Sequence, residues 1–149
     1  MTSGITYALV GIFGLAVLFD YINGFHDTAN AIATSVTTRA LRPGIAIVLS
    51  AIANFLGALT GTEVAATIGS GIVSTPAGNH GQIIIAAALI GGISWNLLTW
   101  RLGLPSSSSH ALIGGLLGAS LAALGGTAVH VEALMSKVVV PLVGSPIEI

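Results

Sequence analysis

Apolar stretches alternate with short polar or glycine-rich segments along the 149 residues of the chain. They cover residues 4–22, 44–61, 83–100 and 111–124, and another apolar stretch begins near residue 129. A helix needs roughly 20 apolar residues to cross the hydrocarbon core of a bilayer. The pattern therefore predicts an all-α, polytopic transmembrane protein in which residues 1–149 form a single membrane domain.

Three segments interrupt this pattern. Gly24 is expected to break the first helix, with helical character resuming over residues 26–40. Residues 62–81 are rich in glycine and threonine and predict a loop or a short interrupted helix. Residues 105–110 begin with proline and contain four serines. Broken or re-entrant helices are expected, because they expose backbone groups to a polar cavity.

The composition strengthens the membrane assignment. Hydrophobic residues make up 54% of the chain and charged residues 6%, where a soluble domain carries roughly 25% charged residues. The net charge of -1 offers no basic surface, so no nucleic acid partner is expected. The lack of cysteine excludes disulfides and thiolate metal sites. We expect a multi-pass protein surrounded by lipid in a cell membrane, with a bacterial inner membrane favoured.

Basic residues predict an orientation. Arg39 and Arg42 lie between the first and second apolar stretches, and Arg101 follows the third. If all three stretches span the bilayer, these arginines share one side, which the positive-inside rule makes cytoplasmic. The N-terminus would then lie outside.

A polar stripe runs through the first helical region. Asp20, Asn23, Asp27 and Asn30 follow the spacing i, i+3, i+7, i+10, and Thr34 continues it. On a helix these positions fall on one stripe roughly 80° wide. Carboxylates within a membrane usually face a protein interior or a water-filled cavity. The stripe therefore indicates a protein that handles an ion or a polar solute.

Residues 24–31 supply the groups that could bind a coupling ion. Asp27 offers a carboxylate, Asn30 an amide and Thr28 a hydroxyl. Oxygen ligands of this kind suit a hard cation such as sodium, whereas a carboxylate alone can carry a proton. The alternative is that Asp27 pairs with an arginine and only holds helices together.

The serines of residues 106–109 supply a different chemistry. Serine is a strong N-cap residue, and the helix that follows would direct its free N–H groups toward these hydroxyls. This arrangement favours an anion, phosphate above all. A serine-rich loop at the membrane surface is the alternative. A carrier that couples a cation to an anion needs both kinds of cluster near the middle of the bilayer.

Both motifs resemble those of the inorganic phosphate transporter (PiT) family. Residues 24–31, Gly-Phe-His-Asp-Thr-Ala-Asn-Ala, look like one family signature, and residues 105–114, Pro-Ser-Ser-Ser-Ser-His-Ala-Leu-Ile-Gly, look like a second. The stretches 54–57 and 95–97 are similar to other parts of that family, so the resemblance covers nearly the whole chain. The His26-Asp27-Thr28 sequence is most similar to the bacterial low-affinity members.

The resemblance implies secondary active transport of inorganic phosphate, free or as a metal–phosphate complex, coupled to a proton or sodium gradient. It implies that Asp27 and Asn30 line the phosphate and ion site and that Ser107, Ser108 and Ser109 bind phosphate. The ion-coupling residues are then His26, Asp27, Thr28 and Asn30. The role of His26 is a hypothesis that rests on imidazole titrating near neutral pH.

The length departs from the family pattern, because members contain an inverted repeat and this chain carries one Asp-Thr-Ala-Asn block. The chain is expected to be the N-terminal repeat alone, either as a truncated piece, paired with a separate second half, or assembled from copies inserted in opposite directions. A homo-oligomer or a second half-transporter chain is thus an expected partner. A membrane assembly subunit with no substrate is a further alternative.

An enzyme is not expected. Ser109, His110 and Asp27 are the residue types of a serine hydrolase, but neighbouring residues on a helix point about 100° apart. His26, Asp27, His80 and His110 match no compact metal-ligand spacing, so neither a metal site nor a cofactor is expected.

Overall fold

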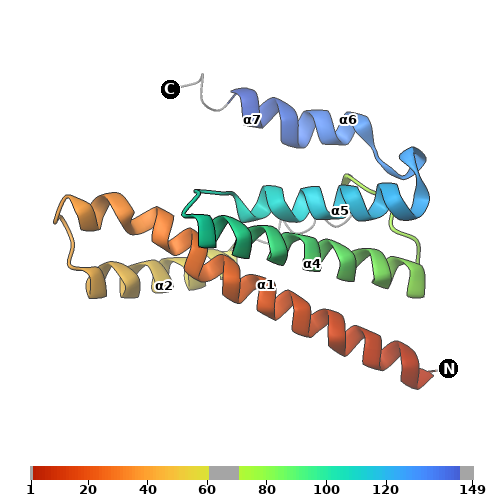
Figure 1. Cartoon of the computed structure of the whole chain (residues 1–149), viewed down its shortest axis with the longest axis horizontal. Coiled ribbons are helices and arrows are strands. Elements are labelled where there is room, and N and C mark those ends of the chain that lie inside the picture. Colours follow the sequence, from red (N-terminus) through yellow and green to blue (C-terminus); the bar gives the residue numbers. More distant parts are fainter. Residues whose placement is uncertain (1, 61–70, 145–149) are drawn as a thin grey trace.

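The computed structural model describes residues 2–60 and 71–144, with side chains from residue 7 onward. These residues form α1 (Thr2–Thr37), α2 (Pro43–Thr60), α4 (Asn79–Leu102), α5 (Ser108–Leu124), η1 (Gly126–Ala128), α6 (Val131–Leu134), a π-helical turn (Met135–Val139) and α7 (Val140–Gly144). Within the described ranges no strand forms, and one isolated bridge joins Val73 to Val129. The predicted all-α architecture is confirmed (Figure 1).

Helix α1 is continuous through Gly24, so the predicted break at that residue is wrong. Glycine inside a helix costs only about 1 kcal/mol relative to alanine, and the apolar residues on both sides sustain the helix. A side chain added at Gly24 would meet nothing within 4 Å, so no close approach requires glycine there. At 1.5 Å per residue α1 is about 54 Å long, which exceeds the roughly 30 Å of a hydrocarbon core.

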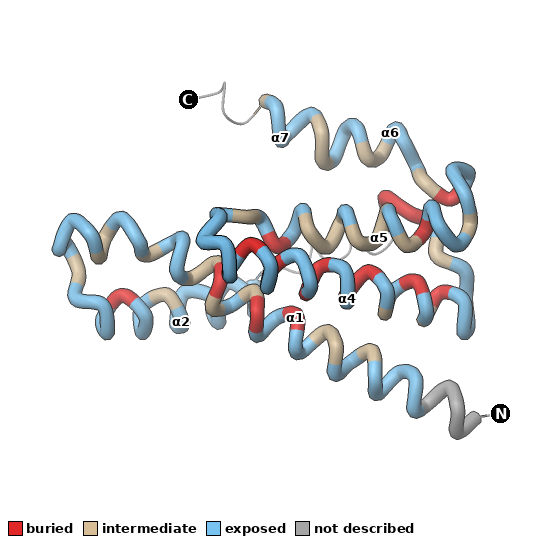
Figure 2. The backbone as a smooth tube through the Cα atoms, viewed as in Figure 1, coloured by how far each residue is buried: buried red, intermediate tan, exposed pale blue. Residues whose placement is uncertain are grey.

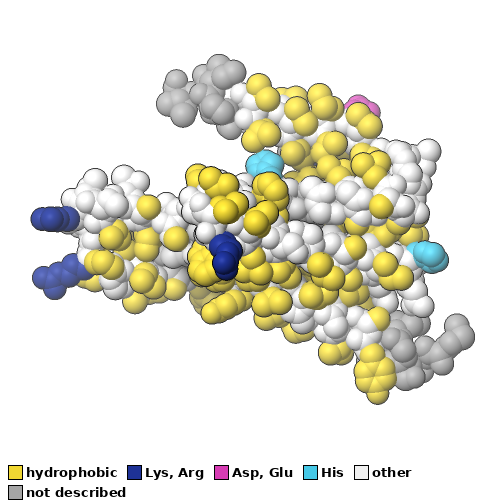
Figure 3. All heavy atoms as spheres, viewed as in Figure 1, with side chains coloured by type: hydrophobic (Ala, Val, Ile, Leu, Met, Phe, Trp, Pro, Cys, Tyr) yellow, Lys and Arg dark blue, Asp and Glu magenta, His cyan; other side chains and the backbone are white. Residues whose placement is uncertain are grey.

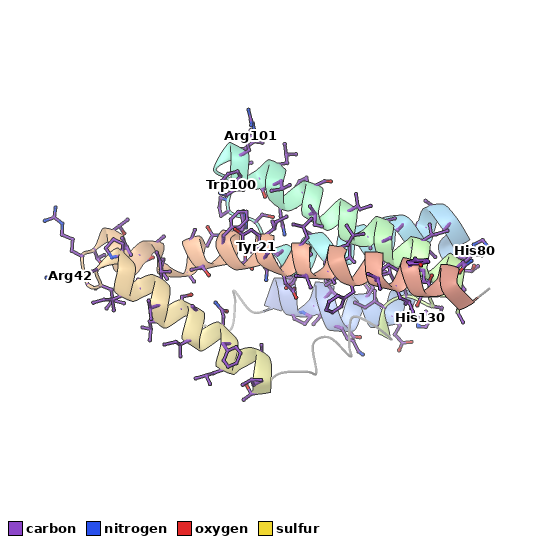
Figure 4. The ribbon with its side chains drawn as sticks, turned by 90° about the horizontal axis from the view of Figure 1, so that it is seen from below. Tyr21, Arg42, His80, Trp100, Arg101 and His130 are labelled. Atoms are coloured by element: carbon purple, nitrogen blue, oxygen red, sulfur yellow. The ribbon has the colours of Figure 1, made fainter. Side chains whose placement is uncertain are left out.

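A tight turn joins α1 to α2. Arg39 adopts a left-handed conformation with φ of 60°, and the N–H of Leu41 donates to the carbonyl of Ser35 at 3.0 Å. Pro43 then opens α2, where its missing N–H removes a donor that would be unsatisfied. Arg39 and Arg42 lie in this turn, and Arg42 is far from Arg101, which lies in the last turn of α4 (Figure 4). The cytoplasmic placement of these arginines stays a prediction.

The core lies where α1, α4 and α5 meet. Phe19 and Ile22 of α1 form a buried cluster with Leu89 and Ile93 of α4, and Leu112 of α5 packs against it. The buried face of α4 runs along its length between the other two helices (Figure 2). Helix α4 is therefore the central element of the described fold.

Glycines let α5 approach α4 closely. A Cβ added at Gly115 would lie 2.5 Å from the carbonyl oxygen of Ala88, and one at Gly92 would lie 3.0 Å from the Phe19 ring and 3.6 Å from Leu112 Cα. Small residues at helix crossings have this effect in membrane proteins, where packing replaces the hydrophobic drive for association.

Most apolar side chains of α1 and α2 remain uncovered (Figure 3). In an 18-residue apolar window of α4, 39% of the window is buried. The corresponding share is 11% for α1 and 6% for α2. All three helices are long and apolar enough to cross a membrane, and α5 is a shorter apolar helix. A surface of this kind suits lipid or further protein, and the chain is a multi-pass membrane protein.

The expected helix after residue 129 also forms, with a local change of winding. In the π-helical turn Met135–Val139 the N–H of Val140 donates to the carbonyl of Met135. Pro141, which follows directly, has no N–H to donate and its ring crowds the preceding turn. A single π-helical turn accommodates this defect without ending the helix.

The tight crossing at Gly115 predicts a stability difference between two adjacent glycines. Gly115→Ala should lower stability by about 1–3 kcal/mol, because the backbone of α4 cannot yield as a flexible side chain would. The matched control is Gly114→Ala, whose added methyl group meets nothing within 4 Å. Thermal unfolding in detergent measures both, and equal melting temperatures would contradict this description of the α4–α5 contact.

Candidate functional site

A helix-terminating motif places the serine segment. Gly103 ends α4 in the left-handed conformation with φ of 67°. The N–H of Leu104 donates to the carbonyl of Thr99 at 2.9 Å, and that of Gly103 to Trp100 at 3.1 Å. This is the Schellman pattern, and the following Pro105 cannot continue the helix. The chain turns back, and α5 begins at Ser108 beside the end of α4.

The four serines make different contacts. Ser106 accepts a hydrogen bond from Trp95 Nε1 at 2.9 Å. Ser107 is the N-cap of α5, accepts from the N–H of His110 at 3.4 Å and lies 2.7 Å from His110 Nδ1. Ser108 is buried and donates to Asp27 Oδ1 at 3.3 Å. Ser109 is exposed. The serine segment thus acts as helix cap, interhelical link and exposed polar surface.

Asp27 lies where the two predicted motifs meet. Its side chain is 47% exposed, while the neighbouring His26 is only 4% exposed. His26 Nδ1 lies 3.5 Å from Asp27 Oδ1, which makes an ion pair when the imidazole is protonated. The Asp27 carboxylate is therefore half-exposed, accepts from a buried hydroxyl and lies beside a buried imidazole.

The remaining residues of the polar stripe, and Thr28 next to Asp27, are half-buried or exposed. Thr28 and Asn23 are half-buried, whereas Asp20, Asn30 and Thr34 are exposed. The structure therefore brings Asp27, His26 and Ser108 into contact, but it does not bring Asn30 or Ser109 into the same cluster. Both residues are exposed, Asn30 on α1 and Ser109 on α5.

Aromatic side chains close the α1–α4 contact beside this cluster. The rings of Tyr21 and Phe25 meet edge to face at 5.8 Å, and those of Phe25 and Trp100 at 5.6 Å. Figure 4 shows Tyr21 on α1 and Trp100 on α4 at this contact. The arrangement anchors α1 to α4 next to His26.

A separate pocket of about 420 Å³ lies between α4 and α5. Trp95, Ser106, Ser107 and His110 contribute to its lining, together with glycines of both helices. Asp27 and Ser108 do not line it, so the pocket and the Asp27–Ser108 contact occupy different sides of the start of α5.

The alternatives for Asp27 and the histidines find little support. Within the residues described, Asp27 pairs with His26 and no arginine lies within salt-bridge distance of it. In the same ranges no group of three His, Cys, Asp or Glu side chains gathers in a metal-binding arrangement. His80 lies at the opposite end of the bundle from Trp100 (Figure 4). His110 contacts Ser107 rather than Ser109, and Asp27 is contacted by Ser108 and His26.

Sequence reasoning missed Asn96. This residue of α4 is completely buried, and neither its Nδ2 nor its Oδ1 has a hydrogen-bond partner. The sequence feature that could have identified this residue is a polar asparagine within the otherwise apolar stretch 83–100.

The contact between Ser108 and Asp27 predicts a coupling between two substitutions. Ser108→Ala and Asp27→Ala each remove one partner of this hydrogen bond and should destabilise the protein. The loss of unfolding free energy in the double variant should be smaller than the sum of the two single losses by about 0.5–1.5 kcal/mol, the net worth of one hydrogen bond. Thermal or denaturant unfolding of the four proteins measures this. Ser109→Ala, which alters an exposed serine, should show no coupling to Asp27→Ala, and strict additivity for Ser108 as well would contradict the contact.

Several curated proteins are similar to this chain. A protein of Streptomyces halstedii is 52% identical over 139 residues, covering 93% of this chain and 64% of the relative, and its name is probable low-affinity inorganic phosphate transporter. A Bacillus subtilis protein of the same name is 53% identical over 132 residues, covering 89% of this chain and 39% of the relative. PitA of Escherichia coli, a low-affinity inorganic phosphate transporter, is 41% identical over 136 residues, covering 87% and 27%.

The chain thus spans less than two thirds of the length of these relatives. No solved structure matches it. The relatives are named as transporters, which agrees with the expectation that the chain is not an enzyme and counts against the hydrolase alternative. The model of the phosphate transporter family matches residues 23–148, which include both predicted motifs. The chain belongs to the phosphate transporter family.

Proposed function

We propose that this chain forms one half of a permease that carries inorganic phosphate across a cell membrane, driven by a proton or sodium gradient. The observation that carries the proposal is the hydrogen bond from Ser108 to Asp27, which joins the acidic motif of α1 to the N-terminus of α5. The names of the relatives supply the substrate.

Phosphate would bind at the N-terminus of α5. The N–H of Ala111 donates to the Ser107 carbonyl and that of His110 to the Ser107 hydroxyl. The amides of Ser108 and Ser109 stand at the start of the helix, where the dipole favours an anion. The hydroxyls of Ser107, Ser108 and Ser109 add donors without a fixed charge, so an oxyanion can bind and leave.

Asp27 would couple the driving ion to phosphate. A bare carboxylate next to the α5 N-terminus repels phosphate, whereas a proton or a sodium ion on Asp27 removes that repulsion. Binding of the cation therefore favours binding of the anion, and thermodynamic reciprocity makes the reverse true. Asn30 and Thr28 provide neutral oxygens for a cation, and His26 at 3.5 Å provides a proton carrier.

The complete carrier would contain a second half. The apolar faces of α1 and α2 that this chain leaves uncovered would pack against a second repeat, on another chain or another copy of this one, and against lipid. A metal–phosphate complex would suit the same site, since the metal belongs to the transported species.

Neutralising Asp27 tests the coupling. Asp27→Asn should lower radiolabelled phosphate uptake into proteoliposomes or cells about tenfold or more, and it should abolish the dependence on the imposed proton or sodium gradient, because no carboxylate remains to bind the cation. Uptake at several pH values, with and without sodium, distinguishes the two ions.

Asp20→Asn is the matched control, because Asp20 lies two turns earlier on α1 and is exposed. It should retain uptake and its gradient dependence. Undiminished, gradient-dependent uptake by Asp27→Asn would overturn the coupling role, and loss of uptake in both variants would indicate a general effect of charge on α1. A purified chain that binds no phosphate, alone or with a second half, would favour an assembly subunit.

A further inference from the structure

Asn96 is the least satisfied polar side chain in the described core. It is 0% exposed, and both Nδ2 and Oδ1 of its carboxamide are without a hydrogen-bond partner. Leaving a buried amide unpaired is costly, and each such group in a folded protein requires an explanation. Asn23 Oδ1 on α1 is buried and has no hydrogen-bond partner either, whereas His26 Nδ1 makes no hydrogen bond but lies 3.5 Å from Asp27 Oδ1.

Contacts one helical turn before and one turn after Asn96 show which parts of α1 and α5 lie opposite it. One turn before it, the space at Gly92 is bounded by Phe19 of α1 and Leu112 of α5. One turn after it, Trp100 meets the ring of Phe25. Asn96 repeats the buried face of Leu89 and Ile93 at helical spacing.

The facing positions on the other two helices follow from the same contacts. On α1 the residues between Phe19 and Phe25 include Asn23, and His26 follows directly. On α5, which runs back along α4, Ser108 lies one turn before Leu112 (Figure 1). Asn23 of α1 and Asn96 of α4 therefore lie at the same height along the bundle as the N-terminus of α5, near Ser108 and Asp27.

We propose that Asn96 is a phosphate-binding residue contributed by α4, which donates from Nδ2 to an oxyanion oxygen held at the N-terminus of α5. The inference rests on the function proposed above and adds a third helix to its site. An uncharged donor is suited to this position, because it offsets the repulsion between Asp27 and an anion without binding the anion irreversibly.

The burial of Asn96 adds a conformational requirement. Because its carboxamide has no exposed surface, phosphate reaches it only when α1 moves away from α4 at this level. The unpaired amide makes the closed arrangement less stable than a fully paired one, and a phosphate oxygen supplies the missing acceptor for Asn96 Nδ2 when the helices part. Phosphate binding and opening of the α1–α4 contact are thus linked.

The test compares two buried, unpaired polar residues. Asn96→Leu keeps the side-chain volume and removes the amide, so it should weaken phosphate binding about tenfold or more, the effect of losing one hydrogen bond to a charged group. The control is Ser120→Ala on α5, which removes a hydroxyl that is equally buried and unpaired but lies three turns from Ser108. Its phosphate affinity should equal that of the wild type.

Equilibrium binding of radiolabelled phosphate to the full chain in lipid nanodiscs provides the readout, with thermal unfolding measured in parallel. Removing an unpaired buried amide should leave the melting temperature unchanged or raise it, so weaker binding would not reflect a damaged fold. Asn96→Gln, which retains an amide, should bind more tightly than Asn96→Leu. Wild-type affinity in Asn96→Leu would overturn the role of Asn96 alone, whereas failure of the wild type itself to bind phosphate would overturn the proposed function.

Discussion

The close packing of α5 against α4 determines where the site can form. At Gly115 the helices approach so closely that a methyl group would collide with the carbonyl of Ala88. This contact fixes the axis of α5, and the Schellman turn at Gly103 fixes where α5 begins. Together they bring the first turn of α5 to α1, so that Ser108 reaches Asp27. The chemistry of the site therefore depends on small residues that have no chemistry of their own.

Some polar side chains at the site have hydrogen-bond or ionic partners, and others that are buried have none. Asp27 retains access to solvent and contacts both Ser108 and His26, whereas Asn23 and Asn96 present buried atoms without hydrogen-bond partners. In a low-dielectric setting both facts matter, because a paired carboxylate is tolerated and an unpaired amide is costly. In the carrier proposed above, such unpaired groups would find partners when the conformation changes around the substrate.

The sequence predicted the helices well, because their positions follow from local patterns, whereas the contact between Asp27 and Ser108 joins residues far apart in the chain. Apolar length identified α2, α4 and α5, and the serine N-cap with its preceding proline marked the start of α5. The break at Gly24 was wrong, since glycine propensity is a weak signal that the flanking apolar turns override. Asn96 was missed because burial on all sides is a tertiary property, which no spacing within α4 reveals.

The four consecutive serines show that residue type alone does not determine the role of each residue. Four consecutive serines are chemically identical in the sequence, yet the turn rotates each into a different environment, so that Ser107 caps its own helix and Ser108 alone reaches across to α1. Helical geometry separates neighbours by about 100°, so adjacent hydroxyls cannot all face one ligand in a static arrangement. If Ser107, Ser108 and Ser109 all contact phosphate, the first turn of α5 must rotate or unwind as the substrate binds. Because Ser108 is also the link to Asp27, the same movement would release the carboxylate, and in the proposed carrier this would connect phosphate binding to the state of the coupling ion within one turn of helix.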